Sequence, residues 1–344
     1  MEFFAGANTV NGFVSLFDEC FRTLKTLYIL KGSSGCGKST LMRRIAGRAQ
    51  REGLEYHIIR CSADPDSLDG VILPSLSVAV ADGTSPHTLD AKYPCVRERL
   101  INLGEFWDEA KIMPHREKIM LLADKKREHY ENAYNALACY KTARDSEEAI
   151  TLSAVDRKKA NELALSLAER SGGEKGEIKT LLTSAFTQSG IKTLETFGNI
   201  NRVYRVKGKN SHYIASRLAL AASELGLGAY ICPSPLDTAR IESVYFEASG
   251  NLFTLLDTPP CKSYAEEINI SSARFTDNTR LADSRNRQRL FAKLGDELLK
   301  EAQLELAEAR KLHSELESLY IPAMDFKRLD EYTLKLSDSV FSNK

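Results

Sequence analysis

The sequence predicts an α/β fold of two tandem modules, each built on a parallel sheet and extended by a long helical hairpin. Three features of the chain lead to this prediction. Short apolar runs alternate with helix-like segments, a frame near residue 27 recurs near residue 203, and a long polar helix-like segment closes each half. Alternating strands and helices are typical of parallel βαβ units, and a repeated frame indicates a duplicated module.

Length and composition agree with two globular modules and exclude several classes of protein. The chain has 344 residues, more than one average domain needs, and its 47 Lys and Arg residues balance 47 Asp and Glu residues. A balanced charge gives no strong field toward nucleic acid or an anionic membrane, so we expect neither as a partner. No apolar run approaches the ~20 residues of a membrane span. The first residues also lack the features of a signal peptide.

The cysteines indicate a reducing compartment. The chain has seven cysteines, and none of them forms a C-x-x-C pair. Scattered thiols without metal-ligand spacing are typical of intracellular proteins and provide neither a disulfide framework nor a zinc site. We therefore expect a cytoplasmic protein.

The repeat is clearest where a strand, a Lys-Gly turn and a helix follow one another. Residues 27–45 read LYILKGSSGCGKSTLMRRI, and residues 203–221 read VYRVKGKNSHYIASRLALA. Further matches follow in the same order, including an apolar run that ends at Asp82 and another that ends at Asp257. Matches that keep one order along the chain indicate a diverged duplication.

Glycines and charged residues mark the boundary between the two copies. The run SGGEKGE at residues 171–177 has the composition of a linker. It divides the chain into predicted domains at residues 1–175 and 176–344, each with a helical extension. The extensions, at residues 117–146 and 283–318, are rich in Ala, Leu, Glu, Lys and Arg with apolar residues at helical spacing. These two helices can pair as an antiparallel layer.

In the first module, the apolar pattern predicts buried strands at residues 27–30, 56–61 and 78–81 and a helix at residues 41–51. The helix ends near a glycine, which commonly follows the last helical turn. The order strand, helix, strand is that of a parallel βαβ unit.

A phosphate-binding motif lies in the first copy of the frame. Residues 32–39 read GSSGCGKS and satisfy G-x-x-x-x-G-K-[ST] between a predicted strand and a predicted helix. Glycines let backbone N–H groups converge on phosphate oxygens, and the helix start adds its positive end. Lys38 is expected to reach the β and γ phosphates, and Ser39 to offer its hydroxyl to Mg²⁺. The residues expected to bind nucleotide are Gly32, Ser33, Ser34, Gly35, Cys36, Gly37, Lys38, Ser39 and Thr40.

This motif makes ATP and Mg²⁺ the predicted cofactors and the modules P-loop NTPase-like. The alternative is a glycine-rich turn with a chance lysine. Asp82 ends an apolar strand beyond the loop, which is the Walker B arrangement, so we expect it to hold Mg²⁺ together with Ser39. The similar run ending at Asp257 supports this assignment; alternatively, Asp82 caps the next turn. His87 is either a γ-phosphate sensor or an ordinary loop residue.

Three carboxylates follow the second predicted strand: Asp64, Asp66 and Asp69. In a parallel sheet this end of the strand faces the ligand crevice, so one of them can position the attacking water. Asp64 is the first choice because it is nearest the strand end, and it joins Lys38 and Asp82 as a predicted catalytic residue. Ordinary turn chemistry explains the same Asp-Pro-Asp sequence.

The second copy of the frame has lost the phosphate loop. Residues 207–216 read KGKNSHYIAS, with a shorter connection to the helix and no G-K-[ST]. His212, Tyr213 and Ile214 bring side chains where a cradle needs bare backbone, and Lys209 alone gives a weak electrostatic site. We therefore predict one nucleotide per chain, bound in the first repeat.

Three further stretches accompany the loop: FAGANT at residues 4–9, CSADPDSLDG at 61–70 and DGTSPH at 82–87. With them, nearly the whole chain resembles a bacterial family of tandem P-loop ATP-binding proteins, described as ATPases with two diverged P-loop repeats and no established substrate. The resemblance implies ATP binding at residues 32–40. Many members of that family keep a working loop in the second repeat as well, and this chain departs from them at residues 207–216.

The leading functional prediction is a Mg²⁺-dependent ATPase or ATP-driven switch with one working module. One alternative is a small-molecule kinase, in which the carboxylates after the second strand bind an acceptor hydroxyl. A kinase usually needs an arginine-rich lid, and no compact lid is evident near the loop. The other alternative is a non-enzymatic ATP-binding scaffold whose helical layer binds a protein partner. An arginine cluster lies in the second copy, at Arg280, Arg285, Arg287 and Arg289.

Overall fold

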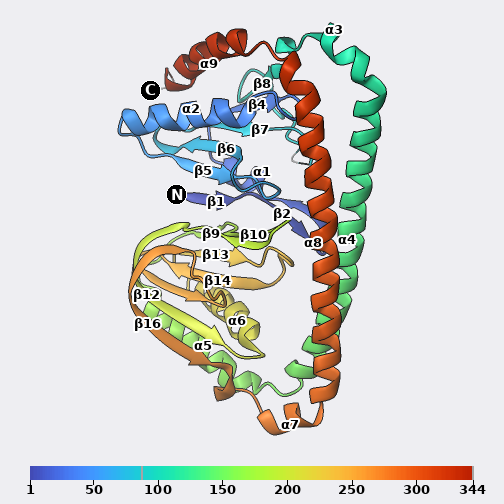
Figure 1. Cartoon of the computed structure of the whole chain (residues 1–344). Coiled ribbons are helices and arrows are strands. Elements are labelled where there is room, and N and C mark those ends of the chain that lie inside the picture. Colours follow the sequence, from blue (N-terminus) through green and yellow to red (C-terminus); the bar gives the residue numbers. More distant parts are fainter. Residues whose placement is uncertain (87, 343–344) are drawn as a thin grey trace.

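The computed structural model describes residues 1–86 and 88–342 and consists of two similar α/β modules (Figure 1). Each module is centred on a mixed six-stranded sheet, with the strand orders β1-β5-β6-β7-β4-β8 and β16-β12-β15-β14-β13-β9. Read in reverse, the second order matches the first strand for strand, so the predicted tandem duplication is confirmed. The first sheet comprises β1 (Glu2–Phe4), β4 (Thr26–Lys31), β5 (His57–Arg60), β6 (Leu68–Leu73), β7 (Val78–Asp82) and β8 (Glu98–Asn102). The second comprises β9 (Ile178–Thr180), β12 (Phe197–Lys207), β13 (Ala229–Pro233), β14 (Ile241–Phe246), β15 (Asn251–Thr254) and β16 (Cys261–Ser271).

A two-stranded hairpin accompanies each sheet, and helices surround both sheets. The hairpins are β2 (Gly6–Thr9) with β3 (Gly12–Ser15), and β10 (Ser184–Thr187) with β11 (Gly190–Thr193). The α-helices are α1 (Phe17–Phe21), α2 (Lys38–Arg51), α3 (Glu109–Ile112), α4 (Arg116–Leu152), α5 (Arg157–Ser171), α6 (Ser211–Glu224), α7 (Asn278–Asp283), α8 (Arg285–Tyr320) and α9 (Phe326–Phe341). Short 3₁₀ helices lie at Pro74–Leu76, Leu103–Phe106, Met113–His115, Ser272–Arg274 and Ile321–Ala323.

The sheets are mixed, which corrects the expectation of all-parallel sheets. Strand β6 runs antiparallel to both β5 and β7, and β14 runs antiparallel to both β13 and β15. The remaining pairs, including β4 with β7 and β4 with β8, are parallel. The reason is the length of the connections, because a parallel neighbour needs a crossover of about a dozen residues or more. Residues 61–67 and 74–77 are too short to make one.

The two long helices pair with each other, as expected, and run the full height of the molecule (Figure 1). One long helix comes from each repeat, so the antiparallel pair forms between the two modules. This corrects the expectation that each module has a helical hairpin of its own. Helix α4 has 37 residues and α8 has 36, which makes each about 54 Å long and able to reach past both sheets. Their contact is lined by small and apolar residues that let the helices approach: Ala133, Ala136, Leu137, Ala302 and Leu306. None of the described helices is both long enough and apolar enough to cross a bilayer.

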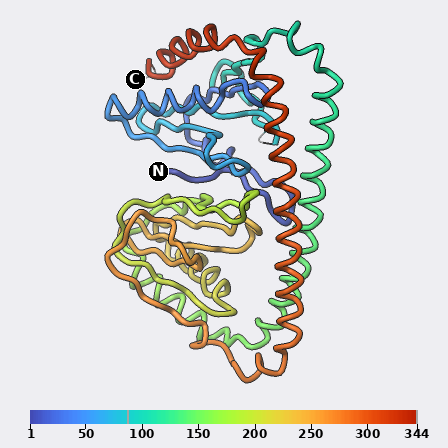
Figure 2. Tube along the Cα trace, in the orientation of Figure 1, coloured from blue at the N-terminus to red at the C-terminus, as the bar shows by residue number. Residues whose placement is uncertain are grey.

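After the long helices, each repeat places its last helix on the other module. Helix α5 of the first repeat packs Ala160, Ala164 and Ala168 into the core of the second sheet, against α6. Helix α9 of the second repeat packs Leu329, Leu336, Val340 and Phe341 into the core of the first sheet, against α2. Figure 2 shows the end of the chain returning to the N-terminal module. The two repeats therefore exchange their final helices.

A third core joins the two modules directly. Phe3 and Ile29 of the first sheet share one buried cluster with Phe197 and Tyr230 of the second. Such a shared apolar core resists independent movement of the sheets, because separating them would expose these side chains to water.

The exchange predicts that α9 stabilises the first module. Leu336→Ala removes a side chain that is 5% exposed, so the free energy of unfolding should fall by about 2–5 kcal/mol in urea denaturation. Leu334→Ala is the matched control, since Leu334 lies on the same helix and is 67% exposed. It should change the unfolding free energy by about 0.5 kcal/mol or less. Equal effects of the two substitutions would contradict the packing of α9 in this core.

Candidate nucleotide-binding site

The glycine-rich loop occupies the turn between β4 and α2 at one end of the first sheet. Gly35 and Gly37 have φ angles of 75° and 85°, which lie in the left-handed region that favours glycine. A Cβ atom on Gly35 would lie 2.8 Å from Ile321 Cγ1, and one on Gly37 would lie 2.8 Å from Leu329 Cδ2. The loop thus needs glycine for its conformation and for the close approach of residues from the second repeat.

Lys38, the first residue of α2, folds back across the loop. Its Nζ donates hydrogen bonds to the carbonyl oxygens of Gly32 at 2.9 Å and Ser33 at 3.0 Å. The same atom lies 3.6 Å from Asp82 Oδ2, and both side chains are 12% exposed. Strands β4 and β7 are parallel neighbours with Leu30 opposite Asp82, so the sheet itself brings the loop and the carboxylate together.

The Asp82 carboxyl is shielded and firmly held. Its Oδ1 accepts hydrogen bonds from the backbone N–H of Thr84 at 2.8 Å and from the Thr84 hydroxyl at 2.6 Å. Burial raises the pKa of Asp82 above its ordinary value, and the Lys38 ammonium opposes that shift. A carboxylate fixed in this way beside a lysine is suited to bind a cation or to orient water.

Ser39 and Asp69 lie on the same side of the loop as Asp82. Ser39 Oγ accepts a hydrogen bond from the backbone N–H of Leu68 at 3.1 Å. The pairing of Gly70 with Ala81 places the next residue, Asp69, opposite Asp82. Asp69 is 4% exposed, and its charge contributes to the raised pKa of Asp82, after burial. Sequence reasoning ranked Asp69 below Asp64, because the antiparallel turn that returns it to the site was not foreseen.

The described residues contain no group of three or more His, Cys, Asp or Glu side chains that could hold a metal ion. Ser39 and Asp82 nevertheless fit a Mg²⁺ ion bound together with phosphate. Mg²⁺ keeps several waters and is usually held by one or two protein carboxylates plus phosphate oxygens.

The remaining predicted residues take different places. Cys36 is buried beneath Gly32, and burial raises the pKa of its thiol, so it acts as packing. Thr40 is exposed on α2. Asp66 meets the Arg43 side chain only through its backbone carbonyl among the interactions described. His87 lies outside the described residues.

Helix α8 of the second repeat covers the loop with three polar residues. Arg310 Nη2 lies 2.8 Å from Asp64 Oδ2. His313 Nδ1 lies 3.3 Å from Ser34 Oγ, and its Nε2 lies 3.5 Å from Glu317 Oε1. The predicted catalytic residue Asp64 is therefore engaged with an arginine carried by the other repeat.

A lysine on α4 completes this cover. Burial lowers the pKa of Lys126, which also interacts with the charges of Glu317 and Lys38. Arg310 is one arginine near the loop, which is not the arginine-rich lid that a kinase usually needs. Its spacing with His313 and Glu317 marks one helical face. The sequence gives no sign that this face meets a loop from the other end of the chain.

In the second module, the residues of the equivalent loop are held by hydrogen bonds to neighbouring parts of the protein. It spans only residues 208–210, between β12 and α6. Lys209 Nζ donates a 2.5 Å hydrogen bond to Gln288 Oε1. Asn210 is fully buried and donates to the carbonyl oxygen of Thr151 at 3.1 Å. These contacts leave the loop little freedom to rearrange around a phosphate.

The register of the second sheet also changes one sequence alignment. Arg205 pairs with Thr254, which places Val206 opposite Leu255, just as Leu30 lies opposite Asp82 in the first sheet. The counterpart of Asp82 is therefore Leu255 and not Asp257. The assignment of Asp82 rests on its contact with Lys38 and gains nothing from the repeat.

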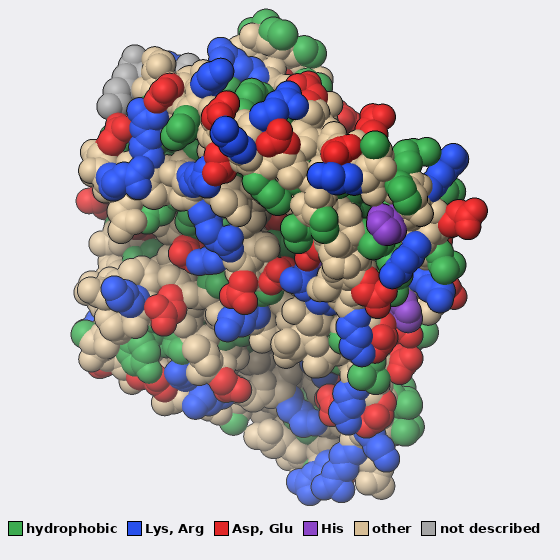
Figure 3. Space-filling model, turned by 45° about the horizontal axis from the view of Figure 1, so that its top comes forward, with side chains coloured by type: hydrophobic (Ala, Val, Ile, Leu, Met, Phe, Trp, Pro, Cys, Tyr) green, Lys and Arg blue, Asp and Glu red, His purple; other side chains and the backbone are tan. Residues whose placement is uncertain are grey.

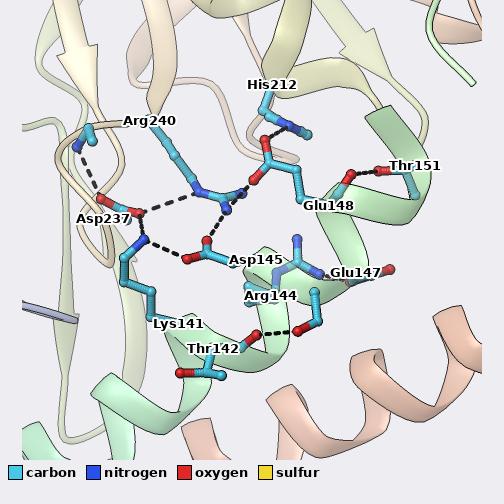
Figure 4. Close-up of polar contacts among 12 residues, drawn as sticks. Lys141, Thr142, Arg144, Asp145, Glu147, Glu148, Thr151, His212, Asp237 and Arg240 are labelled. Carbon is cyan, nitrogen blue, oxygen red and sulfur yellow. Dashed lines mark hydrogen bonds and ion pairs between the residues drawn. The ribbon is translucent and has the colours of Figure 1, made fainter. Parts of the chain in front are cut away.

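Above the shortened loop lies a cavity of about 340 Å³, lined by charged residues of α4 and of the second module. Figure 4 shows that several of these charges are paired with one another. Asp145 Oδ2 lies 2.9 Å from Lys141 Nζ, and Asp145 Oδ1 lies 3.1 Å from Arg240 Nη2. His212 Nε2 lies 2.5 Å from Glu148 Oε1. The wall of the cavity thus contains a network of paired charges. Its other charged lining residues are Arg144, Glu147, Lys209, Asp237 and Glu242.

Basic and acidic side chains are interspersed over much of the face shown in Figure 3, in keeping with the balanced composition.

Comparison of the chain with known protein families, curated proteins and solved structures gave no significant match. The function is therefore inferred from the residues of the chain and their geometry.

Proposed function

We propose that the protein is a Mg²⁺-dependent ATPase or ATP-driven switch with one nucleotide site, in the first module. The observation that carries this proposal is the position of Lys38. It begins α2 directly after the glycine-rich loop, and its Nζ lies 3.6 Å from Asp82 at the end of the neighbouring strand. A lysine, a helix start and a carboxylate at adjacent strand ends provide the charges that a nucleotide phosphate and its metal require.

In this proposal, different residues bind the phosphates, hold the metal and orient the attacking water. The loop backbone and the start of α2 would bind the phosphates, and Lys38 would exchange its loop carbonyls for the β and γ phosphates. Ser39 and Asp82 would hold Mg²⁺, which neutralises charge that develops on the phosphates. Asp69 and Asp64 are both candidates to orient the attacking water. Asp69 lies beside Asp82, whereas Asp64 is paired with Arg310.

A small-molecule kinase remains the second candidate, and Arg310 supplies the observation in its favour. A kinase lid needs cationic groups over the transferred phosphate, and Arg310, which pairs with Asp64, is a candidate for one of them. The two functions differ in the acceptor. An ATPase releases ADP and inorganic phosphate from ATP and water alone, slowly in the absence of a partner. A kinase instead transfers the γ-phosphoryl group to an acceptor hydroxyl and yields ADP and a phosphorylated metabolite.

Lys38→Ala should abolish tight ATP binding while leaving the fold intact, because the lysine is the charge placed on the phosphates. Isothermal calorimetry with ATP and Mg²⁺ should give a stoichiometry near one for the unmodified protein and no measurable binding for the variant. Lys209→Ala, which changes the lysine of the second loop, should retain the stoichiometry and affinity. Tight binding that survives Lys38→Ala would place the nucleotide elsewhere.

Asp82→Asn should retain ATP binding and reduce Mg²⁺-dependent phosphate release at least about tenfold, since the metal loses a charged ligand and the phosphate loop is unchanged. Phosphate release is measured without any added acceptor, and ATP affinity is measured in parallel. A change in turnover of less than about threefold would remove Asp82 from the metal site.

A further inference from the structure

The two modules contain matching ion pairs, each formed across the repeats. Asp64 lies in the loop that joins β5 to β6, and Asp237 lies in the loop that joins β13 to β14. Both loops close in the same way, with Ser67 N donating to Asp64 O at 2.8 Å and Arg240 N donating to Asp237 O at 2.9 Å. Asp64 pairs with Arg310 of α8, and Asp237 pairs with Lys141 of α4 at 3.5 Å.

Each long helix therefore contributes a cation to the module of the other repeat. Helix α4 of the first repeat brings Lys141 to the second module (Figure 4), and α8 of the second repeat brings Arg310 to the first. The two cations differ in their further partners. Lys141 also lies 2.9 Å from Asp145, on its own helix, and Arg240 contacts both Asp145 and Asp237. The pair in the second module is thus held within a larger network.

Arg310 is linked to the phosphate site through its two acidic neighbours. Its partner Asp64 also accepts a hydrogen bond from Ser67 Oγ at 3.1 Å, and Ser67 precedes the residue whose N–H binds Ser39. Its other neighbour is Glu317, 4.0 Å away. A hydrogen bond with His313 holds the pKa of Glu317 below its ordinary value, with smaller contributions from Arg310 and Lys38. The same helix contacts the loop itself, where His313 Nδ1 lies 3.3 Å from Ser34 Oγ, so Arg310 belongs to the helix that covers the glycine-rich loop.

We propose that Arg310 is the residue that distinguishes ATP from ADP in the first module. A bound γ phosphate competes with Asp64 for the guanidinium, because a phosphate carries more charge than a carboxylate and accepts the planar arginine fork through two oxygens. ADP lacks this group and leaves the Arg310–Asp64 pair intact. The inference rests on the proposed function, and it makes the second repeat the part of the chain that responds to the nucleotide.

The retained second module then has a defined role. Helix α8 begins beside the second sheet and ends over the phosphate loop, so a residue of the second repeat can contact the nucleotide only if that helix is anchored. The network around Asp145 and Arg240 provides an anchor through α4, which packs against α8 along its length. In this arrangement the second module needs its sheet and helices to anchor α8, but it does not need a phosphate loop of its own.

The test compares the affinities for ADP and for a non-hydrolysable ATP analogue, with Mg²⁺ present, by calorimetry on the full chain. Arg310→Ala should weaken binding of the ATP analogue at least about tenfold, since the charge-assisted hydrogen bonds of the guanidinium to the γ phosphate are lost, and should leave ADP affinity within about twofold. Arg310→Lys should give an intermediate loss, because it keeps the charge without the fork. Lys141→Ala, the matched control in the second module, should change neither affinity, because Arg240 keeps its own ion pairs with α4 and maintains the anchor.

Asp64→Asn supplies an independent check, because it removes the carboxylate that competes for Arg310. It should raise affinity for the ATP analogue severalfold and leave ADP affinity unchanged. Equal losses for both nucleotides in Arg310→Ala, or an unchanged ratio of the two affinities, would overturn the role of Arg310 while leaving the proposed function in place. An unmodified protein that binds neither nucleotide would overturn both. Circular dichroism confirms that each variant is folded.

Discussion

The antiparallel contact between α4 and α8 determines how the rest of the chain is arranged. Each helix is longer than a single module, so each one starts beside its own sheet and ends beside the other. The alanines at positions 133, 136 and 302 allow the close approach that this contact needs. Because the chain continues from those distant ends, α5 and α9 complete the cores of the opposite modules. The duplication thus produces one interlocked body and not two independent domains.

The same crossing brings polar residues to both loops. Over the glycine-rich loop, α8 contributes Arg310, His313 and Glu317, and over the shortened loop α4 contributes Lys141, Asp145 and Glu148. In the second module carboxylates of α4 pair with the basic side chains of the loop region. These carboxylates neutralise the basic side chains of the second module, as a bound phosphate would, and attach α4 to that module. The second frame can therefore lose its glycines without losing the burial and ion pairs that hold α4 in place.

Local sequence patterns predicted the parts of this structure that depend on nearby residues. The strand before Gly32, the helix after it and the strand that ends at Asp82 follow from apolar runs and turn residues. The contact between Lys38 and Asp82 follows from the parallel pairing of β4 and β7. The direction of β6 was not predicted, because it depends on a short connection that was interpreted as a functional loop. For the same reason Asp69 was ranked below Asp64.

The sequence predicted that the two long helices pair, but not which side chains they bring to the two loops. Arg310 and Asp64 meet because two long helices cross, and neither residue carries a local signal of the other. The similarity of the runs ending at Asp82 and Asp257 was misleading for a related reason, since strand register and not sequence spacing places Leu255 at the equivalent position.

The central claim is that one nucleotide site is assembled from both repeats. A crystal structure of the full chain with Mg²⁺ and a non-hydrolysable ATP analogue tests it most directly. We expect the triphosphate on residues 32–40, the metal against Ser39 and Asp82, Arg310 within hydrogen-bonding distance of the γ phosphate, and no nucleotide in the second module. A nucleotide bound in the cavity beside Asp237 and Arg240, or a triphosphate in the first module that Arg310 does not contact, would contradict the account.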